Sequence, residues 1–121
     1  MTMSELQAAV RERDGVAVID LTGEVNTSAE EALGEAYAEA TAGGATSVAL
    51  NFERADYINS TGIALIVGLL AEARKSGVEV KAFGLSDHYR EIFEITRLAD
   101  FMTIADNEDR AVSGAEGSND A

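Results

Sequence analysis

The sequence contains no cysteine, no proline and no tryptophan, and it has one histidine among 121 residues. Without cysteine the chain forms no disulfide, binds no metal through thiolates and has no cysteine nucleophile. A single histidine leaves too few ligands for a transition-metal cluster, so we predict no metal site, no zinc enzyme and no bound cofactor. Without proline, the turns and helix ends must be set by glycine and by capping residues.

Basic residues are also scarce, because the chain has 9 lysines and arginines against 22 aspartates and glutamates. The formal net charge of −13 argues against direct nucleic-acid binding, since each phosphate contact requires a cation. Two explanations of the acidity stay open. It steers the protein toward a basic partner surface, or it only keeps the protein soluble.

Long apolar runs are missing as well. No stretch approaches the roughly 20 apolar residues that a membrane-spanning helix needs. Residues 1–5 show no basic region followed by an apolar segment, as a secretory signal would. We therefore expect a cytoplasmic protein without membrane insertion.

The chain is long enough for one modest core, with 46% hydrophobic and 26% charged residues. We predict a single domain over residues 1–112. Residues 113–121 are acidic and rich in small side chains, and we expect this tail to be disordered.

Hydrophobic periodicity predicts alternating strands and helices. Asp14 and Gly15 mark a tight turn between the first two strands, and the pair Thr27–Ser28 before Glu30–Glu31 has the spacing of a capping box. The order indicates an α/β domain with a mixed, mostly parallel sheet of about five strands and three to four helices. The predicted elements are strands over 6–11, 16–21, 48–52, 78–82 and 101–104, and helices over 28–42, 60–76, from 86 and over 108–112.

The segment Asp56-Tyr57-Ile58-Asn59-Ser60-Thr61-Gly62-Ile63 places two adjacent hydroxyl residues at the start of the predicted helix 60–76. A hydroxyl in this position can cap the helix, accept a phosphoryl group or act as a nucleophile. Capping is the simplest of the three, because all the residues at this helix start are acceptable there. No acid follows Ser60 by three residues, so no reciprocal capping box forms.

Residues 63–71 of this helix are apolar on every side. Such a helix is either covered on both flanks by the other helices or exposes an apolar strip to a partner. If the strip is an interface, a phosphate on Ser60 would add about −1.5 to −2 charges at its edge. The helix N-terminus tolerates that charge, whereas a desolvated partner surface does not, so the modification would act on binding and not on folding.

Three segments together resemble the STAS domain of bacterial anti-sigma-factor antagonists. They are Leu21-Thr22-Gly23-Glu24-Val25, Ile58-Asn59-Ser60-Thr61-Gly62-Ile63 and Tyr89-Arg90-Glu91-Ile92-Phe93-Glu94-Ile95-Thr96-Arg97-Leu98. The resemblance covers residues 6–112.

This resemblance implies a non-enzymatic binding protein. Its partner would be an anti-sigma factor that is also a serine kinase with a GHKL-type ATP site, and this kinase would phosphorylate Ser60, or alternatively Thr61. A metal-dependent serine phosphatase would reverse the modification. The implied partner-binding residues are Asn26, Asn59, Ser60, Thr61, Gly62 and Leu65.

Two positions depart from the family pattern, because Asn59 and Asn26 stand where members usually carry aspartate. Both changes remove a negative charge near Ser60. They favour an alternative function, a STAS binding subunit that is not switched, in a lipid-transport ABC complex or a sensory scaffold.

A third hypothesis is a small hydrolase that uses Ser60. A triad with His88 and Asp87 can be drawn, but adjacent side chains diverge on a helix and no G-x-S-x-G elbow surrounds the serine. We therefore predict no catalytic residues.

Overall fold

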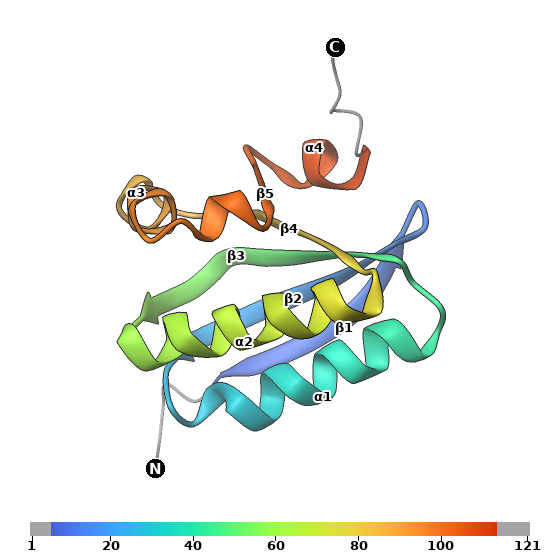
Figure 1. The fold of residues 1–121 in the computed structure, drawn as a ribbon, viewed down its shortest axis with the longest axis horizontal. Coiled ribbons are helices and arrows are strands. Elements are labelled where there is room, and N and C mark those ends of the chain that lie inside the picture. Colours follow the sequence, from blue (N-terminus) through green and yellow to red (C-terminus); the bar gives the residue numbers. More distant parts are fainter. Residues whose placement is uncertain (1–5, 114–121) are drawn as a thin grey trace.

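The computed structural model describes residues 6–113 as a five-stranded sheet flanked by helices (Figure 1). In chain order the elements are β1 (Gln7–Arg13), β2 (Val16–Val25), α1 (Ala29–Ala42), β3 (Ser47–Ile58), α2 (Ser60–Ser76), β4 (Glu79–Phe83), α3 (Asp87–Ile95), the 3-10 helix η1 (Leu98–Asp100), β5 (Thr103–Ala105) and α4 (Glu108–Ser113). The strands lie in the order β1-β2-β3-β4-β5, with β1 and β2 antiparallel and the other pairs parallel. The predicted α/β class and mixed, mostly parallel sheet are confirmed.

Several strand bounds differ from the prediction. β1 ends at Arg13 and β2 at Val25, past the predicted ends at residues 11 and 21. β3 continues to Ile58, well past the predicted end at residue 52, because its second half pairs with the end of β2 up to the pair Val25 and Ile58. The prediction missed this half because most of its side chains are polar and exposed. The last strand begins at Thr103, since η1 and Phe101 precede it. Residues 114–121, most of the predicted tail, lie outside the described residues.

The helices cover the two faces of the sheet unequally. α1 and α2 run side by side over one face, where the larger hydrophobic cluster lies. α3 contributes Phe93 to the same cluster, and its ring meets Phe52 edge-on with the centroids 5.8 Å apart. α4 covers the opposite face through a smaller cluster formed by Val16, Val18, Ala49, Phe83, Ala111 and Val112.

Ionic contacts join α4 to the first strand. Arg11 contacts Glu108 at 2.8 Å and Asp20 at 2.7 Å, and Arg13 contacts Glu108 at 3.0 Å. The Arg11 guanidinium, with a smaller contribution from Arg13, lowers the pKa of Glu108 to about 2. Lys81, which is buried, donates a hydrogen bond to the Ala111 carbonyl at 3.0 Å.

A close backbone contact fixes where α2 begins. Gly62, in the first turn, lies against the end of β2, so that a Cβ at this position would stand 2.0 Å from the Val25 carbonyl oxygen. The same oxygen accepts a hydrogen bond from the Asn59 amide at 3.2 Å. Only glycine fits this contact. The carbonyl oxygen and carbonyl carbon of Val25, which would obstruct a Cβ, belong to the backbone and cannot rotate away.

The ionic contacts of α4 predict that the protein loses stability at low pH. Because the pKa of Glu108 is lower in the folded state than its ordinary value of 4.5, its contribution is fully present above about pH 5 and is lost as the pH falls toward 2. Urea unfolding at several pH values measures this loss. The Glu108→Gln variant should show a shallower decline over the same window, and an unchanged slope would contradict the assignment.

The Gly62 contact predicts opposite effects for two glycine substitutions in one helix. Gly62→Ala should lower the free energy of unfolding by about 1–3 kcal/mol or more, because the added methyl group collides with backbone. Gly68→Ala should raise it by up to about 1 kcal/mol, because Gly68 has no atom within 4 Å of the added methyl and alanine favours helix. Urea unfolding of both variants measures these changes. Equal changes in the free energy of unfolding for the two variants would contradict the close contact at Gly62.

Candidate functional site

The N-terminus of α2 is capped by Asn59 and not by a hydroxyl. The Asn59 side-chain oxygen accepts a hydrogen bond from the Gly62 amide at 2.8 Å, and its backbone is extended, as an N-cap requires. Ser60 is therefore the first residue of the helix. Ser60 and Thr61 are both exposed, and among residues 6–113 their hydroxyl groups make no hydrogen bond. Both hydroxyls are thus accessible to another protein.

The electrostatics at this helix end suit an anion. The first backbone amides of a helix lack partners within it and carry a partial positive charge. α2 has no acidic residue in its first turn, although the chain as a whole has a net charge of −13. A phosphate on Ser60 would gain roughly 0.3–1 kcal/mol from this position when exposed.

Asn26 lies at the end of the neighbouring strand. The pairing of Val25 with Ile58 brings the chain after β2 beside the chain after β3, so that Asn26 and Asn59 follow at the same edge of the sheet. The Asn26 amide group donates to a Glu24 carboxylate oxygen at 3.1 Å. Its charge-free side chain is thus engaged in local structure at the head of α1.

The predicted capping box of α1 is wrong. Ser28 makes no side-chain capping bond, because its backbone is already helical and its hydroxyl points back to Asn26. Asn26 forms the turn that precedes the helix instead, since its side-chain oxygen accepts from the Ser28 amide at 3.0 Å and its carbonyl accepts from the Ala29 amide at 2.9 Å. The Asn26 signal was present in the sequence, as asparagine favours such turns.

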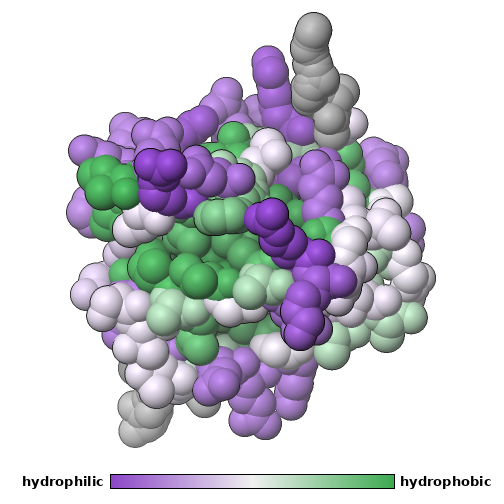
Figure 2. Space-filling model, viewed as in Figure 1, coloured by the Kyte–Doolittle hydropathy of each residue, from purple (hydrophilic) through white to green (hydrophobic). Residues whose placement is uncertain are grey.

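One face of α2 is apolar and exposed. We call this face the α2 strip; it begins at the hydroxyl of Ser60 and continues along the helix through Ala64, Val67, Gly68 and Ala71. The opposite face is buried against the sheet through Gly62, Ile66, Leu69, Leu70 and Ala73. Figure 2 shows hydrophobic surface over α2 on the front of the molecule. Of the two alternatives left open for this helix, covered flanks or an exposed apolar strip, the structure shows the exposed strip.

A hollow lies on each side of the α2 strip. The first, the α1 trough, has a volume of about 350 Å³, and its charged lining residues are the acids Glu30 and Glu72. Leu65, half-buried, lines this trough. The second, the η1 trough, has a volume of about 280 Å³, and its charged lining residues are Arg74 and Arg97. The two flanks of the strip therefore differ in the sign of their charge.

Two tyrosines near Ser60 were not predicted as site residues. Tyr57 is 51% exposed just before the α2 N-terminus. The Tyr89 hydroxyl accepts a hydrogen bond from the Ile58 amide at 3.0 Å, which links α3 to the end of β3. The sequence offered no signal for a place of either tyrosine in the site, because Tyr57 falls between the predicted strand 48–52 and helix 60–76 and Tyr89 lies within the helix predicted from 86.

The other sequence candidates do not assemble a catalytic site. Asp87 and His88 are exposed at the start of α3, and the His88 ring contacts the Tyr89 ring with centroids 4.9 Å apart. Within residues 6–113, no hydrogen bond joins either of them to Ser60, and no group of three potential ligands could hold a metal ion. In the same part of the chain, no helix is long and apolar enough to cross a membrane.

Comparison with known proteins identifies the domain. The family model of the STAS domain matches residues 7–111. The anti-sigma-B factor antagonist of Staphylococcus aureus (strain NCTC 8325 / PS 47) is 36% identical over 61 residues, which cover 50% of this chain and 56% of the relative. The chain thus matches little more than half the length of these staphylococcal relatives. The putative anti-sigma factor antagonist BtrV of Bordetella bronchiseptica is 29% identical over 100 residues, or 83% of this chain and 86% of the relative.

Solved structures agree with this assignment. The Bacillus cell fate determinant SpoIIAA in its phosphorylated form is similar with a TM-score of 0.66 and 26% identity, covering 90% of this chain and 97% of that one. A sulfate transporter family protein from Wolinella succinogenes shares the fold alone, with a TM-score of 0.72 and 17% identity over 84% of this chain and 85% of that one. With the family match spanning nearly all the described residues, this protein belongs to the STAS domain family.

Proposed function

We propose that this protein is a cytoplasmic anti-sigma-factor antagonist, which binds an anti-sigma factor of the serine-kinase class and is released when that kinase phosphorylates Ser60. The observation that carries the proposal is the position of Ser60, exposed at the first residue of α2 and at the head of the α2 strip. The names of the staphylococcal and Bordetella relatives support the antagonist role.

The chemistry follows from that position. The kinase would transfer the γ-phosphoryl group of ATP to the Ser60 hydroxyl oxygen, the bond from the γ-phosphorus to the bridging oxygen would break to release ADP, and the hydroxyl proton would pass to a base of the kinase. The product carries about −1.5 to −2 charges at neutral pH. A partner packed on the α2 strip would have to desolvate this charge, so the affinity falls while α2 stays folded. A metal-dependent serine phosphatase would restore the binding form.

The partner surface extends over both neighbouring strand ends. Asn59 and Gly62 fix the helix start, Asn26 follows the neighbouring strand at the same edge of the sheet, Thr61 adjoins Ser60, and Leu65 lines the α1 trough on the same helix. A similar protein, SpoIIAA, has been solved in a phosphorylated form, which supports a phosphate-bearing state for this fold.

Asn59 bears on whether the switch operates. Its side-chain oxygen makes the capping bond that an aspartate would make, so the neutral residue preserves the position of Ser60 and removes only the charge. That loss of charge is the observation that favours the second candidate function, a STAS subunit without a switch in a lipid-transport ABC complex or a sensory scaffold. Such a subunit would use the same α2 strip without modification.

Phosphorylation mapping tests the proposal. The protein is incubated with ATP, Mg²⁺ and each purified kinase-type anti-sigma factor of the same genome, and modified residues are mapped by mass spectrometry. We expect phosphate on Ser60, its loss in Ser60→Ala and its retention in Thr61→Ala, because Ser60 is the first residue of the strip. Phosphate on Thr61 alone would identify Thr61, and not Ser60, as the residue that is modified. Tight binding without any modification would support the unswitched function instead.

A further inference from the structure

The η1 trough is the one hollow beside the α2 strip whose charged lining is entirely basic. Its walls are otherwise mostly apolar, formed by Val67, Leu70, Ala71, Leu98 and Phe101, with Thr96 at the edge. Two of these side chains are unusually exposed for their size, Val67 at 47% and Phe101 at 56%. A partner that covers the strip can therefore bury them.

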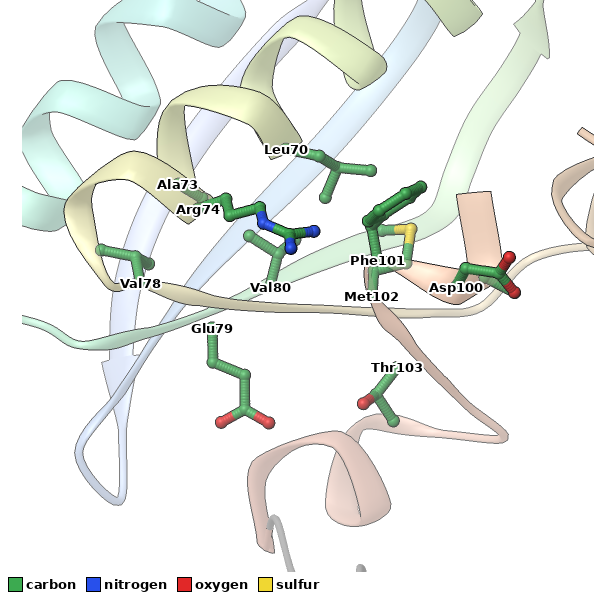
Figure 3. A pocket seen from close by; sticks show the side chains of 11 residues that line it. Leu70, Ala73, Arg74, Val78, Glu79, Val80, Asp100, Phe101, Met102 and Thr103 are labelled. Carbon is green, nitrogen blue, oxygen red and sulfur yellow. The ribbon is translucent and has the colours of Figure 1, made fainter. Parts of the chain in front are cut away.

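Arg74 supplies an available positive charge at this trough. Its guanidinium lies 5.6 Å from the centre of the Phe101 ring, and Figure 3 shows the Arg74 side chain extending toward Phe101. Within residues 6–113, Arg74 forms no salt bridge. Arg97, at the other side, is paired with Asp100 at 2.8 Å. Arg74 is thus the stronger attraction for an incoming carboxylate.

A second hollow beside Phe101 is less favourable for a carboxylate, because its lining contains carboxylates as well as Arg74. It has a volume of about 430 Å³, shares Leu70, Arg74 and Phe101 with the η1 trough, and contains Glu79 and Asp100 (Figure 3). These carboxylates repel an acidic group. A bound carboxylate is therefore directed to the η1 trough.

We propose that the η1 trough binds a segment of the anti-sigma factor in which an aliphatic side chain stands beside a carboxylate. The aliphatic group packs between Val67, Leu98 and the Phe101 ring, and the carboxylate pairs with Arg74. This inference rests on the proposed function, because it assigns the same partner a second point of attachment. It follows from charge complementarity in a protein whose net charge of −13 would otherwise repel an acidic segment.

The dimensions suit one continuous interface. At about 1.5 Å per residue, Val67 lies about 10 Å and Arg74 about 21 Å along the helix from Ser60. A protein–protein interface of ordinary size buries about 800 Å² on each partner, a patch roughly 30 Å across. One partner of ordinary size can therefore cover both Ser60 and the trough. The phosphate acts at one end of this surface, and the trough fixes the orientation of the partner at the other.

Two matched pairs of variants test the trough. Arg74→Glu and Lys75→Glu make the same charge change at adjacent residues of α2, but Lys75 does not line the trough. Phe101→Ala and Ile95→Ala each remove an exposed hydrophobic side chain, and Ile95, 70% exposed, is outside the trough. Affinity for each purified kinase-type anti-sigma factor of the same genome is measured by titration calorimetry without ATP. Thermal unfolding confirms that each variant is folded.

We expect Arg74→Glu and Phe101→Ala each to raise the Kd of the tightest binder at least about tenfold, as buried anchor residues do. Lys75→Glu and Ile95→Ala should change it less than about twofold. Equal losses of affinity within a pair, or no loss of affinity in either pair, would overturn the proposed role of the trough in binding. The proposed function would still stand. If the unaltered protein binds none of these anti-sigma factors, the proposed function fails and the trough assignment fails with it.

Discussion

The position of α2 depends on one close contact, between the backbone of Gly62 and the carbonyl of Val25. A Cβ at residue 62 would stand 2.0 Å from that oxygen, so the helix can approach the end of β2 only because it has glycine there. The Asn59 amide donates to the same oxygen, and the Asn59 side chain caps the helix. These bonds hold the first turn against the sheet edge and turn the hydroxyl of Ser60 outward.

The anchoring of α2 separates the stability of the domain from the properties of its exposed face. Ile66, Leu69 and Leu70 pack against the sheet, while the α2 strip on the opposite face contributes little to the core. The second face of the sheet is stabilised independently by α4 through Arg11, Glu108 and the buried Lys81. On the proposed function, a charge added at Ser60 would change what the strip can bind and would leave the packing that supports the strip unchanged.

Much of this architecture could be predicted from the sequence, because hydrophobic periodicity reports directly on burial. The helix predicted over 60–76 has the observed bounds of α2, whereas the apolar run after Gly62 left open whether the helix is covered or exposes a strip. Contacts between distant residues could not be predicted. Nothing in the sequence shows that Gly62 meets Val25, that β3 extends to Ile58 by pairing with β2, or that Phe101 lies beside Arg74.

The central claim is that phosphate on Ser60 acts on binding and not on folding. The direct measurement compares urea unfolding and anti-sigma-factor affinity for the same preparation before and after enzymatic phosphorylation. The account predicts that the free energy of unfolding stays the same or rises by up to about 1 kcal/mol, from the helix dipole, while the affinity falls at least tenfold. A loss of several kcal/mol in the free energy of unfolding, with or without a change in affinity, would contradict it.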